Sequence, residues 1–267
     1  MGVLNVTPDS FSDGVQLVGR DAAVARGREL VADGAEIIDV GGESTRPGAE
    51  PVSQEEELRR VMPVVEALAG VAGPEVSIDT TKAAVARAAI AAGASVVNDV
   101  SALRLDAAMV EVVADGDVVC CLMHMLGDPR TMQDDPRYED VVSEVKAFLE
   151  QRLAFAVSAG VAEQRVWLDP GIGFGKTLAH NLELLRRLDE IVAIGRPVVI
   201  GTSRKSFLGK LTGRAIDARV SGTVATSVIA YERGARIFRV HDVAAVADAL
   251  AVAAATVAPR WTSTTSR

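Results

Sequence analysis

Eight short apolar runs recur along the chain, and each is followed by polar residues and then by an Ala-rich amphipathic segment. The runs are MGVLN (1–5), AEIIDV (35–40), EVSID (75–79), SVVNDV (95–100), VVCCLMH (118–124), RVWLD (165–169), PVVIG (197–201) and ARIFRV (235–240). Their Val and Ile content with little alternation is typical of strands buried on both faces of a parallel sheet. The segments between the runs predict helices over residues 20–33, 54–69, 82–92, 105–114, 139–159, 179–194, 219–233 and 243–257. Strand and helix therefore alternate along the whole chain, which predicts a parallel α/β fold.

Local signals support the ends of these helices. Ser53 followed by Glu56 has the capping-box pattern of a helix start. Glycines stand where five of the helices should end, at Gly34, Gly93, Gly160, Gly195 and Gly234.

A polar residue lies at or just past the carboxyl end of every run. These residues are Asn5, Asp39, Asp79, Asn98, His124, Asp169, Ser203 and Arg239. An open doubly wound sheet could use the same alternation, but its ligand groups gather at one switch point. In a closed barrel all strand ends surround one mouth, and 267 residues is close to the roughly 250 typical of that fold. We therefore predict a single-domain (β/α)8 TIM barrel over residues 1–260, with its active site at the carboxyl ends of the strands, and a disordered polar tail at 261–267.

Charge and composition limit the possible partners. The net charge of −8 and the pI near 5.0 argue against a nucleic-acid-binding surface, which would be basic. The chain shows no signal-peptide pattern and no apolar run of about 18 residues, so we expect a cytoplasmic protein that acts on small molecules and does not bind a membrane. Cys120 and Cys121 are neighbours on one predicted strand and should point to opposite faces, so we expect no disulfide.

The stretch LDPGIGFGKT (168–177) has the ending of a nucleotide phosphate-binding loop in Gly175, Lys176 and Thr177. That motif needs a glycine five positions before Gly175, and Pro170 occupies the position. The stretch is therefore not predicted to bind a nucleotide, which leaves open why Asp169 precedes a glycine-rich bend.

Two carboxylates and one amide at the strand ends predict a ligand site. Asp79, Asn98 and Asp169 each follow apolar residues, so each is drawn toward the barrel axis, where an unpaired carboxylate is costly. Such a set suits a planar ring rich in hydrogen-bond donors, such as an aminopyrimidine. Asp39 is interpreted instead as a helix cap or as an organiser of the second loop.

Basic residues on other loops predict an anion pocket. They are Arg46 in GGESTRPG, Lys205 in GTSRKSFLG, and Arg239 with His241 in RVHD. Each could be an ordinary surface cation, but together around one mouth of an acidic protein they favour an oligo-anion.

A hard cation could accompany that anion. Asn5 and Asp13 offer oxygen ligands, and Mg²⁺ usually takes one or two protein oxygens plus substrate phosphates. His124 and His180 lack the spacing of zinc ligands and are predicted to be structural.

Eight motifs together resemble one family, dihydropteroate synthase. They are MGVLNVTPDSFSDG, VGGESTRPGA, SIDT, VNDVS, LMHM, LDPGIGFGK, GTSRKSFLG and FRVHDV, in the family's order along the whole chain. The resemblance implies a (β/α)8 barrel, a homodimer and a Mg²⁺ cofactor. It also implies the condensation of 6-hydroxymethyl-7,8-dihydropterin pyrophosphate with p-aminobenzoate to 7,8-dihydropteroate and pyrophosphate, which sulphonamides should inhibit by competing with p-aminobenzoate.

The resemblance also assigns residues to each part of the reaction. The pterin-binding set would be Asp79, Asn98, Asp169, Lys205, Met123 and Phe174, and the pyrophosphate set Asn5 (next to Mg²⁺), Arg239 and His241. The p-aminobenzoate pocket would be formed by Phe11, Asp13, Thr45, Arg46, Pro47 and Ser206. Catalysis would depend on Lys205, Arg239, His241, Asp13 and Arg46, with an SN1-like departure of pyrophosphate.

Two other functions are compatible with parts of this pattern. A methyltetrahydrofolate:corrinoid methyltransferase would share the pterin carboxylates and the amide, but it has no need for the cations that suit pyrophosphate. A paralogue that binds pterin without catalysis should have lost loop residues such as Arg46 or Lys205, and both are present.

Overall fold

The computed structural model describes residues 1–6, 16–44, 49–70, 73–128 and 131–257. Its strands are β1 (Gly2–Asn5), β2 (Ile37–Gly41), β3 (Glu75–Asp79), β4 (Val96–Asp99), β5 (Val119–Met123), β6 (Val166–Asp169), β7 (Val199–Ile200) and β8 (Ile237–Phe238). Its helices are α1 (Gln16–Ala32), α2 (Gln54–Ala69), α3 (Ala83–Ala91), α4 (Met109–Gly116), α5 (Val141–Ser158), α6 (Leu178–Arg186), α7 (Leu188–Val192), α8 (Ser206–Thr212), α9 (Val220–Glu232) and α10 (Val243–Val257), with short 3-10 turns at Glu163–Arg165 and Ile216–Ala218. The predicted tail at 261–267 lies outside the described residues.

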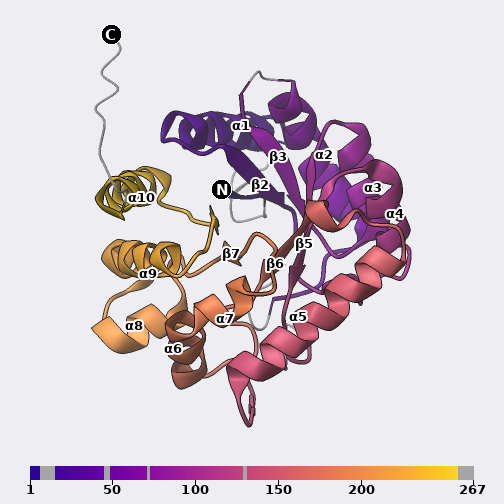
Figure 1. Cartoon of the computed structure of the whole chain (residues 1–267). Helices are drawn as coiled ribbons and strands as arrows, with labels where there is room; N and C mark the ends of the chain where they lie inside the picture. The colour runs from indigo at the N-terminus through magenta and orange to yellow at the C-terminus, as the bar shows by residue number, and fades with distance from the viewer. Residues whose placement is uncertain (7–15, 45–48, 71–72, 129–130, 258–267) are drawn as a thin grey trace.

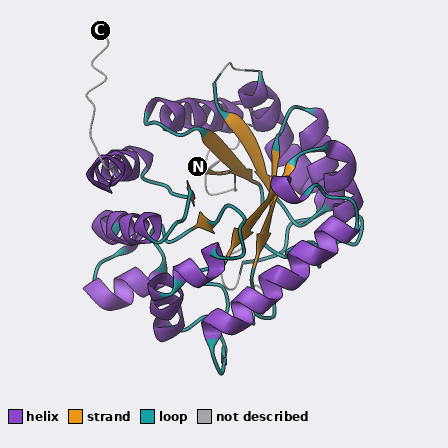
Figure 2. Cartoon of the chain, in the orientation of Figure 1, coloured by secondary structure: helices purple, strands orange, loops and turns teal. Residues whose placement is uncertain are grey.

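The strands pair in parallel and in chain order, as a (β/α)8 barrel requires. One sheet runs from β1 to β6, and β7 pairs with β8. Isolated parallel bridges join the two sheets, from Leu168 in β6 to Val198 just before β7 and from Gly2 in β1 to Val240 just after β8. Around the strands, α1 to α5 follow one another in chain order, and the adjoining α6 and α7 and then α8, α9 and α10 complete the circuit (Figure 1). The strands thus lie inside a helical layer (Figure 2).

Every predicted strand and helix is present, with three differences. β7 and β8 contain two residues each, where longer strands were expected. The helix predicted over 179–194 is divided at Arg187 into α6 and α7, and α8 was not predicted.

The predicted helix ends are largely confirmed. All five glycines predicted to end helices have positive φ angles, between 91° and 105°. Ser53 caps α2 by accepting from the Glu56 amide, but the Glu56 carboxylate pairs with Arg59 and Arg60. The predicted capping box is therefore formed on one side only.

The apolar core lies between the strands and the helices. Alternate strand residues such as Ile38, Ile78 and Leu122 are fully buried in that layer. Cys120 belongs to it and its neighbour Cys121 does not, and both thiols are free, as predicted. The other strand face is turned to the barrel interior and carries polar side chains. Within the described ranges no helix is both long and apolar enough to cross a bilayer.

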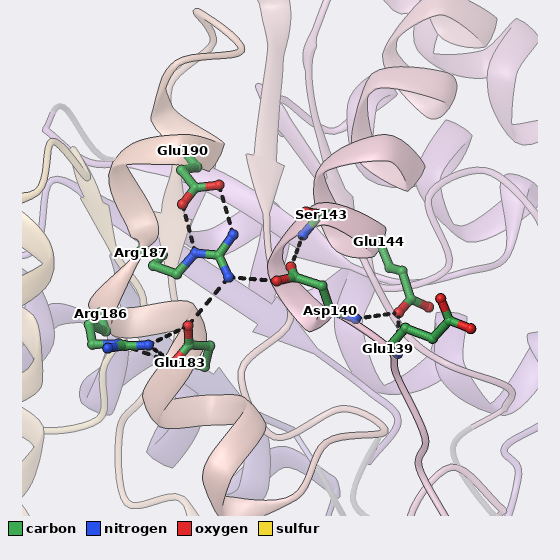
Figure 3. Close-up of polar contacts among 8 residues, drawn as sticks. All are labelled: Glu139, Asp140, Ser143, Glu144, Glu183, Arg186, Arg187 and Glu190. Carbon is green, nitrogen blue, oxygen red and sulfur yellow. Dashed lines mark hydrogen bonds and ion pairs between the residues drawn. The ribbon is translucent and has the colours of Figure 1, made fainter.

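An ion-pair cluster connects the divided helix to the start of α5 (Figure 3). Arg187, at the junction of α6 and α7, donates to Asp140 at 2.7 Å and to Glu190 at 2.6 Å and 3.0 Å. Asp140 caps α5 by accepting from the Ser143 amide at 2.7 Å. The bond from Arg187 and that from the Ser143 amide lower the pKa of Asp140 to about 2.

We expect Arg187→Met to lower the thermal midpoint by a small amount that decreases as salt is raised to about 1 M, because the pairs are exposed and screened. The difference from the unmutated protein should be present above pH 3.8 and should be lost as the pH falls through about 2, because Asp140 is then protonated in both folded and unfolded chains. Thermal unfolding followed by circular dichroism measures both effects. Arg186→Met, which removes a pair within α6 alone, is the control, and equal midpoints for the two variants would contradict the connecting role of Arg187.

Candidate active site

An arginine joins two buried carboxylates at the mouth of the barrel. Arg239, directly after β8, donates from Nε to Asp39 Oδ2 at 2.6 Å and from Nη2 to Asp79 Oδ2 at 2.6 Å. Asp39 also accepts from the Ser77 hydroxyl at 2.6 Å and from the Asn98 amide at 3.2 Å. Four strands, β2, β3, β4 and β8, are therefore connected through side chains, and Asp79 and Asn98 lie together as predicted.

The interpretation of Asp39 as a cap or loop carboxylate is wrong. Asp39 lies within β2, is fully buried, and forms an ion pair with Arg239 inside the barrel. Its sequence signal was its place in the middle of an apolar run, where a lone carboxylate needs a buried partner. Ser77, which shares this network, was also missed because a serine in a strand carries little information.

The charges of this network depend on burial. Burial raises the pKa of Asp79 to about 7, although Arg239 acts in the opposite direction. Burial disfavours the charge of Arg239, but the Asp39 and Asp79 carboxylates raise its pKa above the ordinary value. Arg239 thus stays charged, while Asp79 can change its protonation near neutral pH.

A third buried carboxylate, Asp169 at the end of β6, lies close to Lys205. Asp169 accepts from the Gly171 amide at 2.7 Å, and burial raises its pKa while the charge of Lys205 lowers it. Lys205 donates to the Ile172 carbonyl, and its Nζ lies 4.6 Å from the centre of the Phe174 ring. Burial lowers the pKa of Lys205 to about 8.

The glycine-rich bend packs on the end of β5. Gly171 has φ +67°, and a Cβ atom there would lie 1.9 Å from the His124 carbonyl oxygen. Met123 and Phe174 pack in a small apolar cluster with Val100, Met125 and Met132. A side chain at position 171 would push the bend away from β5, so the glycine allows the ring of Phe174 to approach Met123.

The contacts of Lys176 and Thr177 exclude a phosphate-binding role for the GKT sequence. Lys176 is buried, and its Nζ contacts His124 Nδ1 at 2.9 Å. Thr177 caps α6 in a reciprocal arrangement with His180, whose predicted structural role is thereby confirmed.

The remaining candidates are partly described. The Ser203 Oγ lies 2.9 Å from His241 Nδ1 and accepts from the His241 backbone amide at 3.1 Å. His241 follows Arg239 by two residues. Ser206 is exposed at the start of α8, and Asn5 is exposed at the end of β1. Phe11, Asp13, Thr45, Arg46 and Pro47 lie outside the described residues. Within the described ranges, no group of three His, Cys, Asp or Glu residues could hold a metal ion.

We expect Asp39→Asn to lower the free energy of unfolding by about 3 kcal/mol, because Arg239 would lose one of two partners in a buried network. Urea unfolding measures this change. Asp135→Asn, which breaks an exposed pair with Arg137, should change it by less than about 1 kcal/mol. Equal losses in the two variants would show that the buried network does not depend on the Asp39 charge.

The fold and the mouth residues define a TIM-barrel enzyme class whose site presents buried carboxylates, an amide and cations to a small ligand. The sequence profile described as pterin binding enzyme matches residues 1–241. The dihydropteroate synthase of Haemophilus influenzae is 46% identical to this chain, over 96% of this chain and 93% of its own length. That of Escherichia coli K12 is also 46% identical, over 97% of this chain and 92% of its own length. That of Neisseria meningitidis serogroup C is 49% identical, over 94% of this chain and 89% of its own.

Solved structures agree with these relatives. The Yersinia pestis dihydropteroate synthase in a sulfonamide drug complex is 46% identical with a TM-score of 0.91, over 96% of this chain and 93% of that one. The Xanthomonas albilineans enzyme with 4-aminobenzoic acid is 50% identical with a TM-score of 0.90, over 97% of this chain and 93% of that one. The chain therefore belongs to the pterin binding enzyme family and, within it, to the dihydropteroate synthases.

Proposed function

We propose that the chain condenses 6-hydroxymethyl-7,8-dihydropterin pyrophosphate with p-aminobenzoate, which yields 7,8-dihydropteroate and pyrophosphate in folate biosynthesis. The observation that carries this proposal is the set of buried groups Asp79, Asn98 and Asp169 at three strand ends, beside Lys205. Relatives of nearly equal length are dihydropteroate synthases, and the Xanthomonas albilineans enzyme is known in complex with 7,8-dihydropteroate.

The pterin would bind in the carboxylate half of the site. Its ring N–H groups and its amino group are donors, which suit acceptors at Asp79, Asn98 and Asp169. Lys205 would donate to the ring, and Met123 with Phe174 would pack near it. The low exposure of these acceptors strengthens their hydrogen bonds and favours a ligand that supplies several donors at once.

The pyrophosphate would bind where the cations lie. Two N–H groups of Arg239 bond to Asp39 and Asp79, and its other N–H groups can donate to phosphate oxygens. His241 and Asn5 would complete the anion site.

Mg²⁺ fits this part of the site because Asn5 offers a hard oxygen ligand at an exposed strand end, and Mg²⁺ usually relies on few protein ligands when phosphates are present. Asn5 would hold the ion, which would supply positive charge next to the leaving group.

The p-aminobenzoate pocket would lie on the rim, where Phe11, Asp13, Thr45, Arg46, Pro47 and Ser206 are assigned by family resemblance. Ser206 at the start of α8 lies directly after Lys205, so the two halves of the site would meet there.

The chemistry would depend on the departure of pyrophosphate. An aromatic amine is neutral and weakly nucleophilic, so a general base has little to do. Lys205, Arg239 and His241 would stabilise the charge that develops on pyrophosphate, while the pterin ring delocalises the positive charge on its methylene carbon. Loss of one such contact commonly lowers the rate by about 10²–10³, and the expected displacement is SN1-like, with Asp13 and Arg46 on loops that exclude water.

The further assignments are that residues 1–260 form one domain, that the protein forms a homodimer, and that it acts in the cytoplasm. Size-exclusion chromatography with light scattering tests the homodimer directly.

The first test is turnover. Purified protein should release pyrophosphate only when dihydropterin pyrophosphate, p-aminobenzoate and Mg²⁺ are all present, and Asp79→Asn should lower the rate by about 10² because the pterin loses a charged acceptor. Asp117→Asn, which removes an exposed carboxylate before β5, should leave the rate unchanged. Pterin binding without pyrophosphate release would favour an inactive paralogue, and methyl transfer from methyltetrahydrofolate would favour the corrinoid enzyme.

Binding of a pterin without the pyrophosphate should depend on pH. Asp79 accepts well only as the carboxylate, so affinity should fall as the pH is lowered through about 7. Lys205 donates as the ammonium, so affinity should also fall above about 8, which gives a bell-shaped profile. Fluorescence titration of the pterin measures this profile, and Asp79→Asn should remove its acidic limb. An acidic limb that persists in Asp79→Asn would assign it to another group.

A further inference from the structure

The bend after β6 is held by side chains at four successive carbonyls. Lys205 donates to Ile172, Gln133 to Gly173, Lys176 to Phe174 and Tyr138 to Gly175. The donors come from the loops after β5 and β7 and from the bend itself. The conformation of this bend is therefore determined by side-chain donors.

Lys176 differs from the other donors because its amine is almost completely buried. The residue is 3% exposed, and among the described residues no carboxylate lies within ion-pair distance of its Nζ. The Nζ contacts His124 Nδ1 and the Phe174 carbonyl, both at 2.9 Å, and the His124 carbonyl at 3.5 Å. Burial lowers the pKa of Lys176 well below its usual value, and the Asp169 charge opposes this effect.

The cost of this burial needs an explanation. A buried lysine amine with no ion-pair partner among the described residues loses its hydration, and its contacts with His124 and with the Phe174 carbonyl return only part of that free energy. The lysine therefore needs a reason beyond filling space in the core.

The contacts of Lys176 indicate that reason. It connects the bend to His124, whose amide bonds the Asp169 carbonyl at 2.9 Å, and so ties the end of β5 to the residue before the bend. It also fixes the backbone of Phe174, whose ring lies against Lys205. Asp169 and Phe174 both belong to the pterin half of the site.

We propose that Lys176 is a positioning residue for the pterin half of the site, which holds Phe174 and His124 in place. The proposal rests on the proposed function, because Phe174 and Asp169 are assigned to the pterin there. Lys176 acts through Phe174 and His124 and does not itself touch the pterin.

The test is Lys176→Met in the full-length protein. The protein should still fold, with some loss of stability because the Phe174 carbonyl and His124 Nδ1 lose their partner, while the KM for dihydropterin pyrophosphate and the dissociation constant of the free pterin rise about tenfold through misplacement of the ring. The KM for p-aminobenzoate should change by less than about twofold. Lys146→Met, an exposed lysine on α5, is the matched control and should change none of these.

A double-mutant cycle with Phe174→Ala locates the effect. If Lys176 acts in part through Phe174, the loss of pterin affinity in the double variant should be smaller than the sum of the two single losses. Additive losses would overturn this route.

Other outcomes would overturn the proposal as a whole. They are failure of Lys176→Met to fold, which would make the lysine structural, and an equal rise in KM for both substrates. The proposed function fails separately, when the unmutated protein neither binds the pterin nor releases pyrophosphate.

Discussion

The ion pairs of Arg239 with Asp39 and Asp79 are the interaction on which the mouth of the barrel depends. They connect the last strand to the second and third, across the place where β8 meets β1 through an isolated bridge. A buried arginine with two carboxylates is retained only if all partners are present, because loss of one leaves a charge without compensation. The same contacts that tie the last strand to β2 and β3 therefore also orient the Asp79 carboxylate, which the register of β3 and β4 sets opposite Asn98.

The alternation of strands and helices was predictable because it depends on local patterns. Apolar runs, helix-ending glycines and the Ser53 cap depend on neighbouring residues, and all eight strands were found within a few residues of their positions. β7 and β8 are shorter than predicted, because strand length depends on pairing with partners that the local pattern does not reveal. The division at Arg187 likewise depends on Asp140, which lies 47 residues earlier.

The site was predictable where a residue type is unusual for its place. Asp79, Asn98 and Asp169 stood out after apolar runs, and the structure buries all three near the strand ends. Asp39 was missed because its partner Arg239 is 200 positions away, and residues judged one at a time cannot show a pair. Lys176 was seen only as part of a misleading GKT ending, since burial of a lysine depends on what the bend packs against.

The two faces of the strands separate two tasks. The outer face packs apolar residues against the helices, and the inner face carries the polar groups of the mouth. Substitutions on one face change few contacts of the other, because successive side chains point in opposite directions. A barrel of this kind can therefore acquire a different ligand preference through changes at inner positions, while its resistance to unfolding is adjusted independently at outer ones.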